Sequence, residues 1–205
     1  MNKVLSAAYR NNIARVAGVV VTKPITYTCY GKVFYAFDLC VKRMRGTEDL
    51  IPVNMPVVLR EELNFGDEIC LIGQIRTYNK VLDGKCRLIV AFFAIETAKY
   101  EGYENDVDLK GFFCRSPVLR STPLGRDICD AQIAVNREWH KSDYIPLIVW
   151  DKKALFASVL DVGAHVDIKG RLQSRVYLKQ TESGLIEKIA YEVSVSKISE
   201  VSDDE

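Results

Sequence analysis

The stretch TPLGRDICDAQIAVNREW, residues 122–139, contains the pattern that decides the fold of this chain. A turn signal opens it, small apolar residues then alternate with polar ones, and a polar segment ends in Trp139. Strict alternation is typical of a strand with one buried face, because successive side chains leave opposite faces. The residues predicted to face a core are Cys129, Ala131, Ile133 and Val135.

Two further stretches alternate in the same way. DYIPLIVW, residues 143–150, predicts a core face of Ile145, Leu147 and Val149 and an outer face of Tyr144, Pro146, Ile148 and Trp150. VDIKGRLQSRVYLK, residues 166–179, predicts a core face of Val166, Ile168, Leu172 and Val176. Its outer face then carries Lys169, Arg171, Arg175, Tyr177 and Lys179.

The chain contains two copies of one plan. NNIARVAGVVVTKP (residues 11–24) and NDVDLKGFFCRSP (residues 105–117) share Asn, Gly and Pro at one spacing, with an offset of 93. GKVFYAFDLCVKR from Gly31 matches GRDICDAQIAVNR from Gly125 at an offset of 94, and GDEICLIGQI from Gly66 matches GAHVDIKGRL from Gly163 at 97. Matching order with small drift indicates a tandem duplication.

Each copy is predicted to form five short strands, with one short helix before the fourth strand. The residue offset between the two copies increases from 94 to 97 within the segment that is predicted to be helical. We therefore expect a helix one turn longer in the second copy. The fold class is all-β: two tandem five-stranded Greek-key barrels of the OB type. We expect an N-terminal domain at 1–100, a C-terminal domain at 101–199 and an acidic tail at 200–205, with a linker near 97–105.

Composition excludes several classes of function. The 205 residues are 48% hydrophobic and 27% charged, with a net charge of +1, and no stretch reaches membrane-spanning length. We find no glycine-rich phosphate loop, nucleophile elbow or paired carboxylates beside a histidine, so the chain is not expected to be an enzyme. Six cysteines without a Cys-x-x-Cys pair and two histidines argue against a metal or other cofactor, and favour a reducing cytoplasm.

Charge is divided unevenly between the two copies. Residues 1–100 hold 14 basic against 9 acidic side chains, whereas residues 101–205 hold 14 against 18. The N-terminal copy is therefore basic, and the acidic excess of the C-terminal half lies largely in its last residues.

The second copy resembles the bacterial single-stranded DNA-binding protein family over most of residues 105–195. The resemblance implies an OB fold that binds single strands without sequence preference, by stacking bases on aromatic rings along a basic groove. The stacking positions that it implies are Trp139, Tyr144, Trp150 and Tyr177. The phosphate contacts that it implies are Arg115, Arg120, Arg126, Lys152, Arg171 and Arg175. Lys169 and Lys179 join them because they share the outer face of Tyr177.

The first copy matches this family only in its framework. Leu50 and Pro56 stand where the second copy has Tyr144 and Trp150, and Lys80 corresponds to Tyr177. It still offers Tyr78 for stacking and a set of cations for phosphates, namely Lys42, Arg43, Arg76 and Lys80. We therefore expect the first copy to hold the backbone and the second to stack bases.

The expected function is single-stranded DNA binding in replication, recombination or repair. The resemblance further implies four OB folds per assembly, hence a homodimer of this chain, and possible replication or repair proteins as partners, with no membrane. The tail SEVSDDE lacks the apolar ending by which relatives recruit partners. Two alternatives stay open: a primosome-type accessory protein, and an OB-fold protein-interaction module with weak or no DNA binding.

Overall fold

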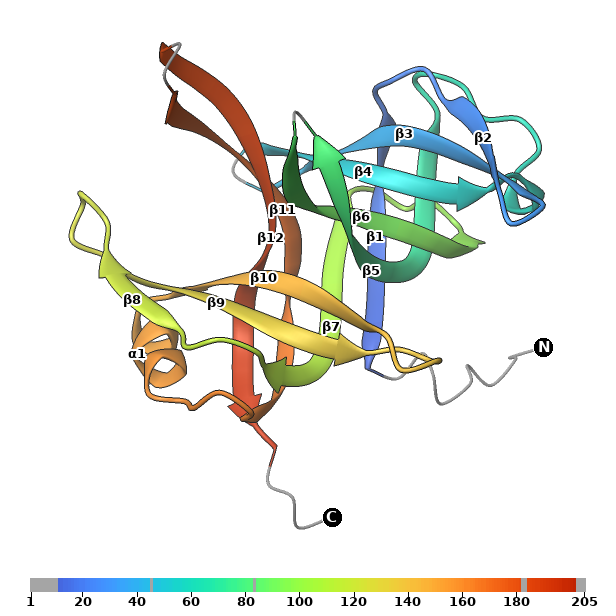
Figure 1. Ribbon diagram of the computed structural model, residues 1–205. Helices are drawn as coiled ribbons and strands as arrows, with labels where there is room; N and C mark the ends of the chain where they lie inside the picture. The colour runs from blue at the N-terminus through green and yellow to red at the C-terminus, as the bar shows by residue number, and fades with distance from the viewer. Residues whose placement is uncertain (1–10, 45, 83, 182–183, 202–205) are drawn as a thin grey trace.

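The computed structural model describes residues 11–44, 46–82, 84–181 and 184–201, and these residues are mostly β-strand (Figure 1). The predicted acidic tail begins at Glu200, the last residue of a strand, and its residues 202–205 lie outside the described ones. The predicted linker is short, because strand pairing ends at Ala98 and resumes at Glu104.

The N-terminal half forms one closed barrel. Its strands are β1 (Asn12–Val20), β2 (Ile25–Cys29), β3 (Lys32–Lys42), β4 (Glu48–Pro56), β5 (Glu68–Leu82) and β6 (Lys85–Ala98). The barrel closes in the order β1-β3-β4-β6-β5-β1, with a parallel pair between β4 and β6, while β2 is a hairpin partner of β3.

The C-terminal half repeats this topology strand for strand. Its strands are β7 (Glu104–Phe113), β8 (Val118–Ser121), β9 (Asp127–Asn136), β10 (Ser142–Trp150), β11 (His165–Thr181) and β12 (Gly184–Glu200). The closing order is β7-β9-β10-β12-β11-β7, with β10 and β12 parallel. The prediction of two five-stranded barrels of the OB type is confirmed.

The helical segment has seven residues in the second half and three in the first, a difference of about one turn, as the offsets predict. The second half has an α-helix, α1 (Lys152–Ser158), and the corresponding segment of the first half is a 3-10 helix, η2 (Val57–Leu59). The short helix predicted in the first copy is therefore present, as a 3-10 helix rather than an α-helix. Two β-branched valines disfavour a helix at 57–58, whereas the KKALFAS segment of α1 consists mainly of good helix formers.

The duplicated asparagines make the same contacts in both barrels. The Asn12 side chain donates to the carbonyl of Ile75 (2.8 Å) and accepts from its N–H (3.0 Å). Asn105 bonds Leu172 in the same way, at 2.7 and 2.9 Å. Ile75 and Leu172 differ by the offset of 97 that the repeat gave for this strand, so the duplication holds at the level of single hydrogen bonds.

The two barrels are joined by antiparallel pairing of β1 with β7, which makes one continuous 12-stranded sheet (Figure 1). Ala14 lies opposite Val107, its own equivalent in the other copy. Asn12 pairs with Leu109 and Val16 with Asn105, so equivalent positions are exchanged around that central pair. The barrels are therefore related by a pseudo-twofold axis through the pair of Ala14 and Val107.

Two predicted side-chain orientations were wrong. Ile148, expected on the outer face, is only 2% exposed, because β12 and the N-terminal β5 also contact β10. Val176, expected in the core, is 60% exposed, because the pairing of β11 with β7 ends at Gly170. Beyond that residue β11 pairs only with β12, and the two strands project as a hairpin, which we call the β11–β12 arm (Figure 1).

Candidate nucleic-acid interface

Two buried aspartates join each barrel to the other near the pseudo-twofold axis. Asp143 of β10 is fully buried and accepts from the N–H of Thr77 on β5 at 2.7 Å. Its carboxylate also pairs with Arg76 at 2.8 Å and with Arg137 at 3.4 Å. The N–H of Tyr144 donates to the Thr77 hydroxyl at 2.7 Å, so β10 and β5 are tied at adjacent residues.

The equivalent contacts recur on the other side of the axis. Asp49 of β4 is fully buried, pairs with Arg43, and accepts from the N–H of Ser174 on β11 at 3.0 Å. The N–H of Leu50 donates to the Ser174 hydroxyl at 2.9 Å. These two sets of contacts, the Asp143 and Asp49 clamps, were missed by sequence reasoning. The sequence feature that could have indicated them is an Arg-x5-Asp pair that occurs in both copies at an offset of 94.

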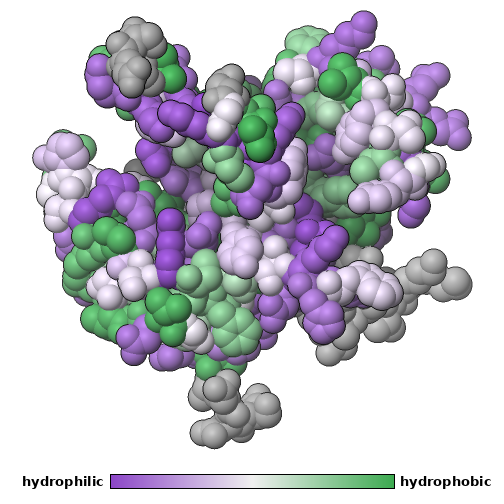
Figure 2. Space-filling view, viewed as in Figure 1, coloured by the Kyte–Doolittle hydropathy of each residue, from purple (hydrophilic) through white to green (hydrophobic). Residues whose placement is uncertain are grey.

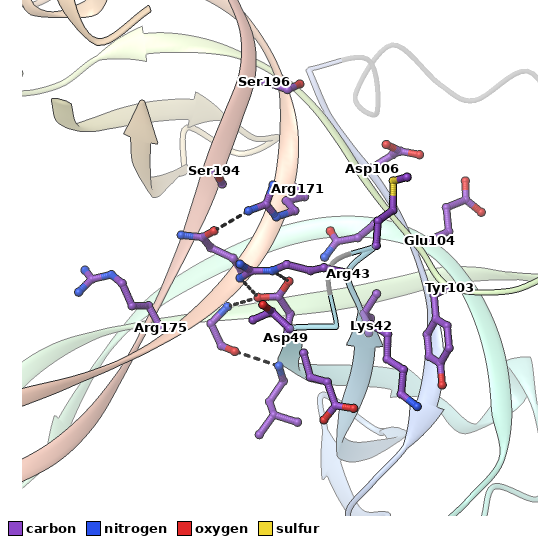
Figure 3. A pocket seen from close by; sticks show the side chains of 18 of the residues that line it. Lys42, Arg43, Asp49, Tyr103, Glu104, Asp106, Arg171, Arg175, Ser194 and Ser196 are labelled. Carbon is purple, nitrogen blue, oxygen red and sulfur yellow. Dashed lines mark hydrogen bonds and ion pairs between the residues drawn. The ribbon is translucent and has the colours of Figure 1, made fainter. Parts of the chain in front are cut away.

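A cleft of about 1300 Å³ lies between the barrels on the Asp49 side (Figure 3). The β3–β4 loop forms one wall, and the base of the β11–β12 arm forms the other. On the face shown in Figure 2, hydrophilic side chains cover the base of that arm. Of the side chains predicted to contact nucleic acid, the cleft brings together Lys42, Arg43, Arg126, Trp150, Arg171 and Arg175.

An arginine covers a ring face at two of the predicted stacking positions. The Arg126 guanidinium lies 4.8 Å from the centre of the Trp150 ring and is held there by Asp151 at 2.7 Å. This ion pair lowers the pKa of Asp151. Arg175 lies 5.7 Å from the Tyr177 ring centre, and its hydrogen bond to Glu192 raises its pKa. A base that stacks on either ring would contact the arginine beside the ring or would displace that arginine from the ring face.

Trp139 is the most exposed of the predicted aromatic residues. Its side chain is 86% exposed in the β9–β10 turn, and its φ of 64° lies in the left-handed region. His140 follows with a φ of 53°, where the first copy has Gly46 at 81°. A bulky residue in this conformation carries backbone strain of about 1–3 kcal/mol. Packing of the ring does not offset this backbone strain, because the exposed ring contributes little to the core.

Tyr144 and Tyr78 lie on the Asp143 side of the axis. Both rings are exposed, at 47% and 51%, and each follows directly after a residue of the Asp143 clamp. The predicted site residues therefore fall into two groups, one on each side of the pseudo-twofold axis. Trp150 and Tyr177 belong to the Asp49 side.

Half of the twelve predicted phosphate-binding cations already have an acidic partner. The pairs are Arg43–Asp49, Arg76–Asp143, Arg120–Asp130, Arg126–Asp151, Lys169–Asp108 and Arg175–Glu192. Lys42 lies 5.5 Å from the ring centre of Tyr103. Lys80, Arg115, Lys152 and Lys179 are exposed and form neither an ion pair nor a ring contact with any described residue. These exposed charges can meet phosphates without breaking an existing bond.

Within residues 11–44, 46–82, 84–181 and 184–201, no three His, Cys, Asp or Glu side chains gather in a way that could hold a metal ion. In the same residues no helix has both the length and the apolar character to span a membrane.

Comparison with known proteins finds relatives of the C-terminal barrel. The model of the single-strand binding protein family matches residues 104–201, the C-terminal barrel. A single-stranded DNA-binding protein of Halalkalibacterium halodurans is 36% identical over 80 residues, which are 36% of this chain and 48% of that protein. Single-stranded DNA-binding protein 1 of Lactococcus lactis is 34% identical over 83 residues, 37% of this chain and 55% of the other. The chain thus spans about half the length of the curated relatives it matches.

A solved structure extends the likeness to both barrels. The wild-type single-stranded DNA binding protein from Thermus aquaticus superposes with a TM-score of 0.75 at 20% identity, covering 95% of this chain and 94% of that one. At this identity the superposition shows a common fold. The sequence likeness to the single-strand binding protein family thus lies in the C-terminal barrel, residues 104–201, whereas the likeness of fold covers both barrels.

Proposed function

We propose that this chain binds single-stranded DNA without strong sequence preference, and protects it during replication, recombination or repair. The observation that carries the proposal is Trp139, an almost fully exposed indole held in a strained backbone conformation. Strained residues cluster at ligand-binding sites, where the strain serves to present a side chain. The names of the relatives and the cations around the cleft support the same function.

The two kinds of contact have separate roles in this proposal. Rings at Trp139, Tyr144, Trp150, Tyr177 and Tyr78 stack on bases, each stack contributing about 1–3 kcal/mol. Phosphates meet the unpaired cations first: Lys80, Arg115, Lys152 and Lys179. The ion-paired ones, Arg120, Arg126, Lys169, Arg175, Arg43 and Arg76, add a positive field or exchange their acid for a phosphate, and Lys42 at the Tyr103 ring adds to that field.

A titration of the full chain with oligo(dT) at several salt concentrations tests the proposal. Both tryptophans lie in the C-terminal barrel, so stacking on either ring is expected to quench intrinsic fluorescence. The association constant should fall steeply as salt rises, because phosphate contacts release counterions. Unchanged fluorescence, together with no shift of a labelled oligonucleotide in anisotropy, would refute DNA binding.

A second function, protein interaction, is favoured by exposed apolar surfaces. Leu155, Phe156, Val159 and Val162 are exposed on and after α1, over which apolar atoms gather in Figure 2. The N-terminal barrel has an apolar pocket of about 580 Å³ beside η2. A chain that acted only through such surfaces, as an accessory protein or interaction module, would give no quenching in the titration.

We also infer that two chains associate, which places four barrels in one assembly. The support is the β11–β12 arm, where Val176, Leu178, Leu185 and Ile189 are 45–63% exposed on one face of the hairpin. All six cysteines are free, which supports a reducing compartment such as the bacterial cytoplasm.

A further inference from the structure

Arg171 has an incompletely bonded guanidinium in the wall of the interbarrel cleft. Its Nη2 donates to the Gln173 side chain at 3.2 Å, but its Nε is buried and has no hydrogen-bond partner among the described residues. Asp49 is the carboxylate that attracts the Arg171 charge, but both of its oxygens already accept hydrogen bonds from Arg43. Burial and the nearby charge of Arg43 lower the pKa of Arg171. A buried N–H without an acceptor is costly, and that cost disappears when an acceptor enters the cleft.

The duplication supplies an internal comparison. At the offset of 97, Gln74 and Arg76 of the first barrel correspond to Arg171 and Gln173 of the second, so the two residue types are exchanged. In the first barrel, Arg76 donates to Gln74 and also pairs with the buried Asp143 at 2.8 Å. In the second, the arginine stands two residues earlier and forms no ion pair with Asp49 or any other described acid. The exchange leaves one guanidinium available in the cleft.

We propose that Arg171 binds a phosphate of the DNA backbone inside the interbarrel cleft, so that the bound strand passes between the two barrels. This inference rests on the proposed function. A phosphodiester oxygen supplies the acceptor that Arg171 Nε lacks, and its negative charge compensates the adjacent guanidinium groups of Arg43 and Arg171. Figure 3 shows both side chains, with Arg175 beyond them along the arm.

The shape and lining of the cleft favour a polymer strand. Its volume of about 1300 Å³ exceeds the ~300–1,000 Å³ of small-molecule sites. Trp150 and Arg126 line the same cleft, so a base and a phosphate of one strand can be held together there. Of the four acids in its lining, Glu104 is paired with Arg15 and Asp49 with Arg43. Glu48 and Asp106 form no ion pair with a described residue, but the lining also contains five cations, which outnumber the four acids.

The test compares Arg171→Gln with Arg60→Gln in the full chain. Both variants lose one positive charge, but Arg60 lies outside the cleft and pairs with Asp67 on the N-terminal barrel. The probe is a labelled oligo(dT) of about 30 nucleotides, long enough for two OB folds at roughly 4–16 nucleotides each. For Arg171→Gln we expect about 3- to 10-fold weaker binding and a salt slope smaller by about 0.7, the value for one phosphate contact on a single strand. Arg60→Gln should retain the wild-type slope.

A double variant, Arg171→Gln with Gln173→Arg, separates the contact from net charge. It keeps every charge but recreates the arrangement of the first barrel, in which the arginine is engaged by a buried aspartate. We expect the same loss of slope as in Arg171→Gln. If the wild type binds DNA and Arg171→Gln matches Arg60→Gln in affinity and slope, this proposal is overturned. A wild type that binds no oligonucleotide overturns the proposed function instead.

Discussion

At the scale of single residues, Trp139 separates stability from binding more cleanly than any other side chain. Its ring is exposed, and its left-handed φ is a conformation that glycine adopts without strain. The first copy places Gly46 in the corresponding turn, one position later. Stability and affinity should therefore respond in opposite directions when this ring is removed.

We expect Trp139→Gly to retain or slightly raise the urea midpoint, because the strained backbone is relieved. DNA affinity should fall by about 1–3 kcal/mol, roughly 5- to 150-fold, through the loss of one stacked base. The anisotropy of a labelled oligo(dT) measures the affinity, and circular dichroism in urea measures the stability. A destabilised variant with intact affinity would place Trp139 in a structural role.

The sequence reveals residue types but not the partners they meet. The alternation of strand residues placed Tyr144 and Tyr177 on outer faces, and both are exposed. It could not reveal that Arg126 lies over the Trp150 ring or that Asp151 holds it there, because that contact joins two strands through a loop. Charge pairing across a fold depends on side-chain reach, which strand periodicity does not encode.

At the scale of elements, the repeat predicted strand order well because each barrel must close around its own core. The offsets of 93, 94 and 97 correspond to real strand equivalences, as the bonds of Asn12 and Asn105 demonstrate. The wrong predictions concern strand segments that contact the other barrel or that extend out of their own barrel. Ile148 is buried by extra neighbours, and Val176 is exposed because its strand leaves the barrel.

The Asp143 and Asp49 clamps are expected to couple the unfolding of the two barrels. Asp143→Asn leaves Arg76 and Arg137 without their carboxylate, at a cost of about 3 kcal/mol, the lower end for a broken buried pair because the arginines are partly exposed. Combined with Asp49→Asn, it should separate the fluorescence transition, which reports only on the C-terminal barrel, from the circular dichroism transition of the whole chain.

A surface pair provides the matched control for the clamps. Lys99 and Glu101 form an ion pair at 3.0 Å with side chains 84% and 71% exposed, so Glu101→Gln should cost no more than about 1 kcal/mol. If the double clamp variant keeps coincident transitions and unfolds at the wild-type urea concentration, the clamps do not couple the barrels.

At the scale of the whole molecule, the inferred association of two chains depends on the apolar face of the β11–β12 arm. The wild type should sediment at twice its 23.2 kDa chain mass. Replacing Val176 and Leu178 by aspartate should yield single chains that remain folded, since both residues are about 60% exposed and outside the core. Val58→Asp changes a residue of the other barrel that is even more exposed, and it should leave the mass unchanged. A wild type that sediments as one chain would remove the proposal.

Because β1 and β7 belong to one polypeptide, the association of the two barrels does not depend on protein concentration. Separate barrels held only by that edge pairing would part at low concentration, whereas here the second barrel always stays within reach of the first. For the proposed single-strand binding, engagement of the second barrel becomes an intramolecular event with an effective concentration in the millimolar range. The length of DNA covered by one chain should therefore be the same in a cell holding few copies as in one holding many.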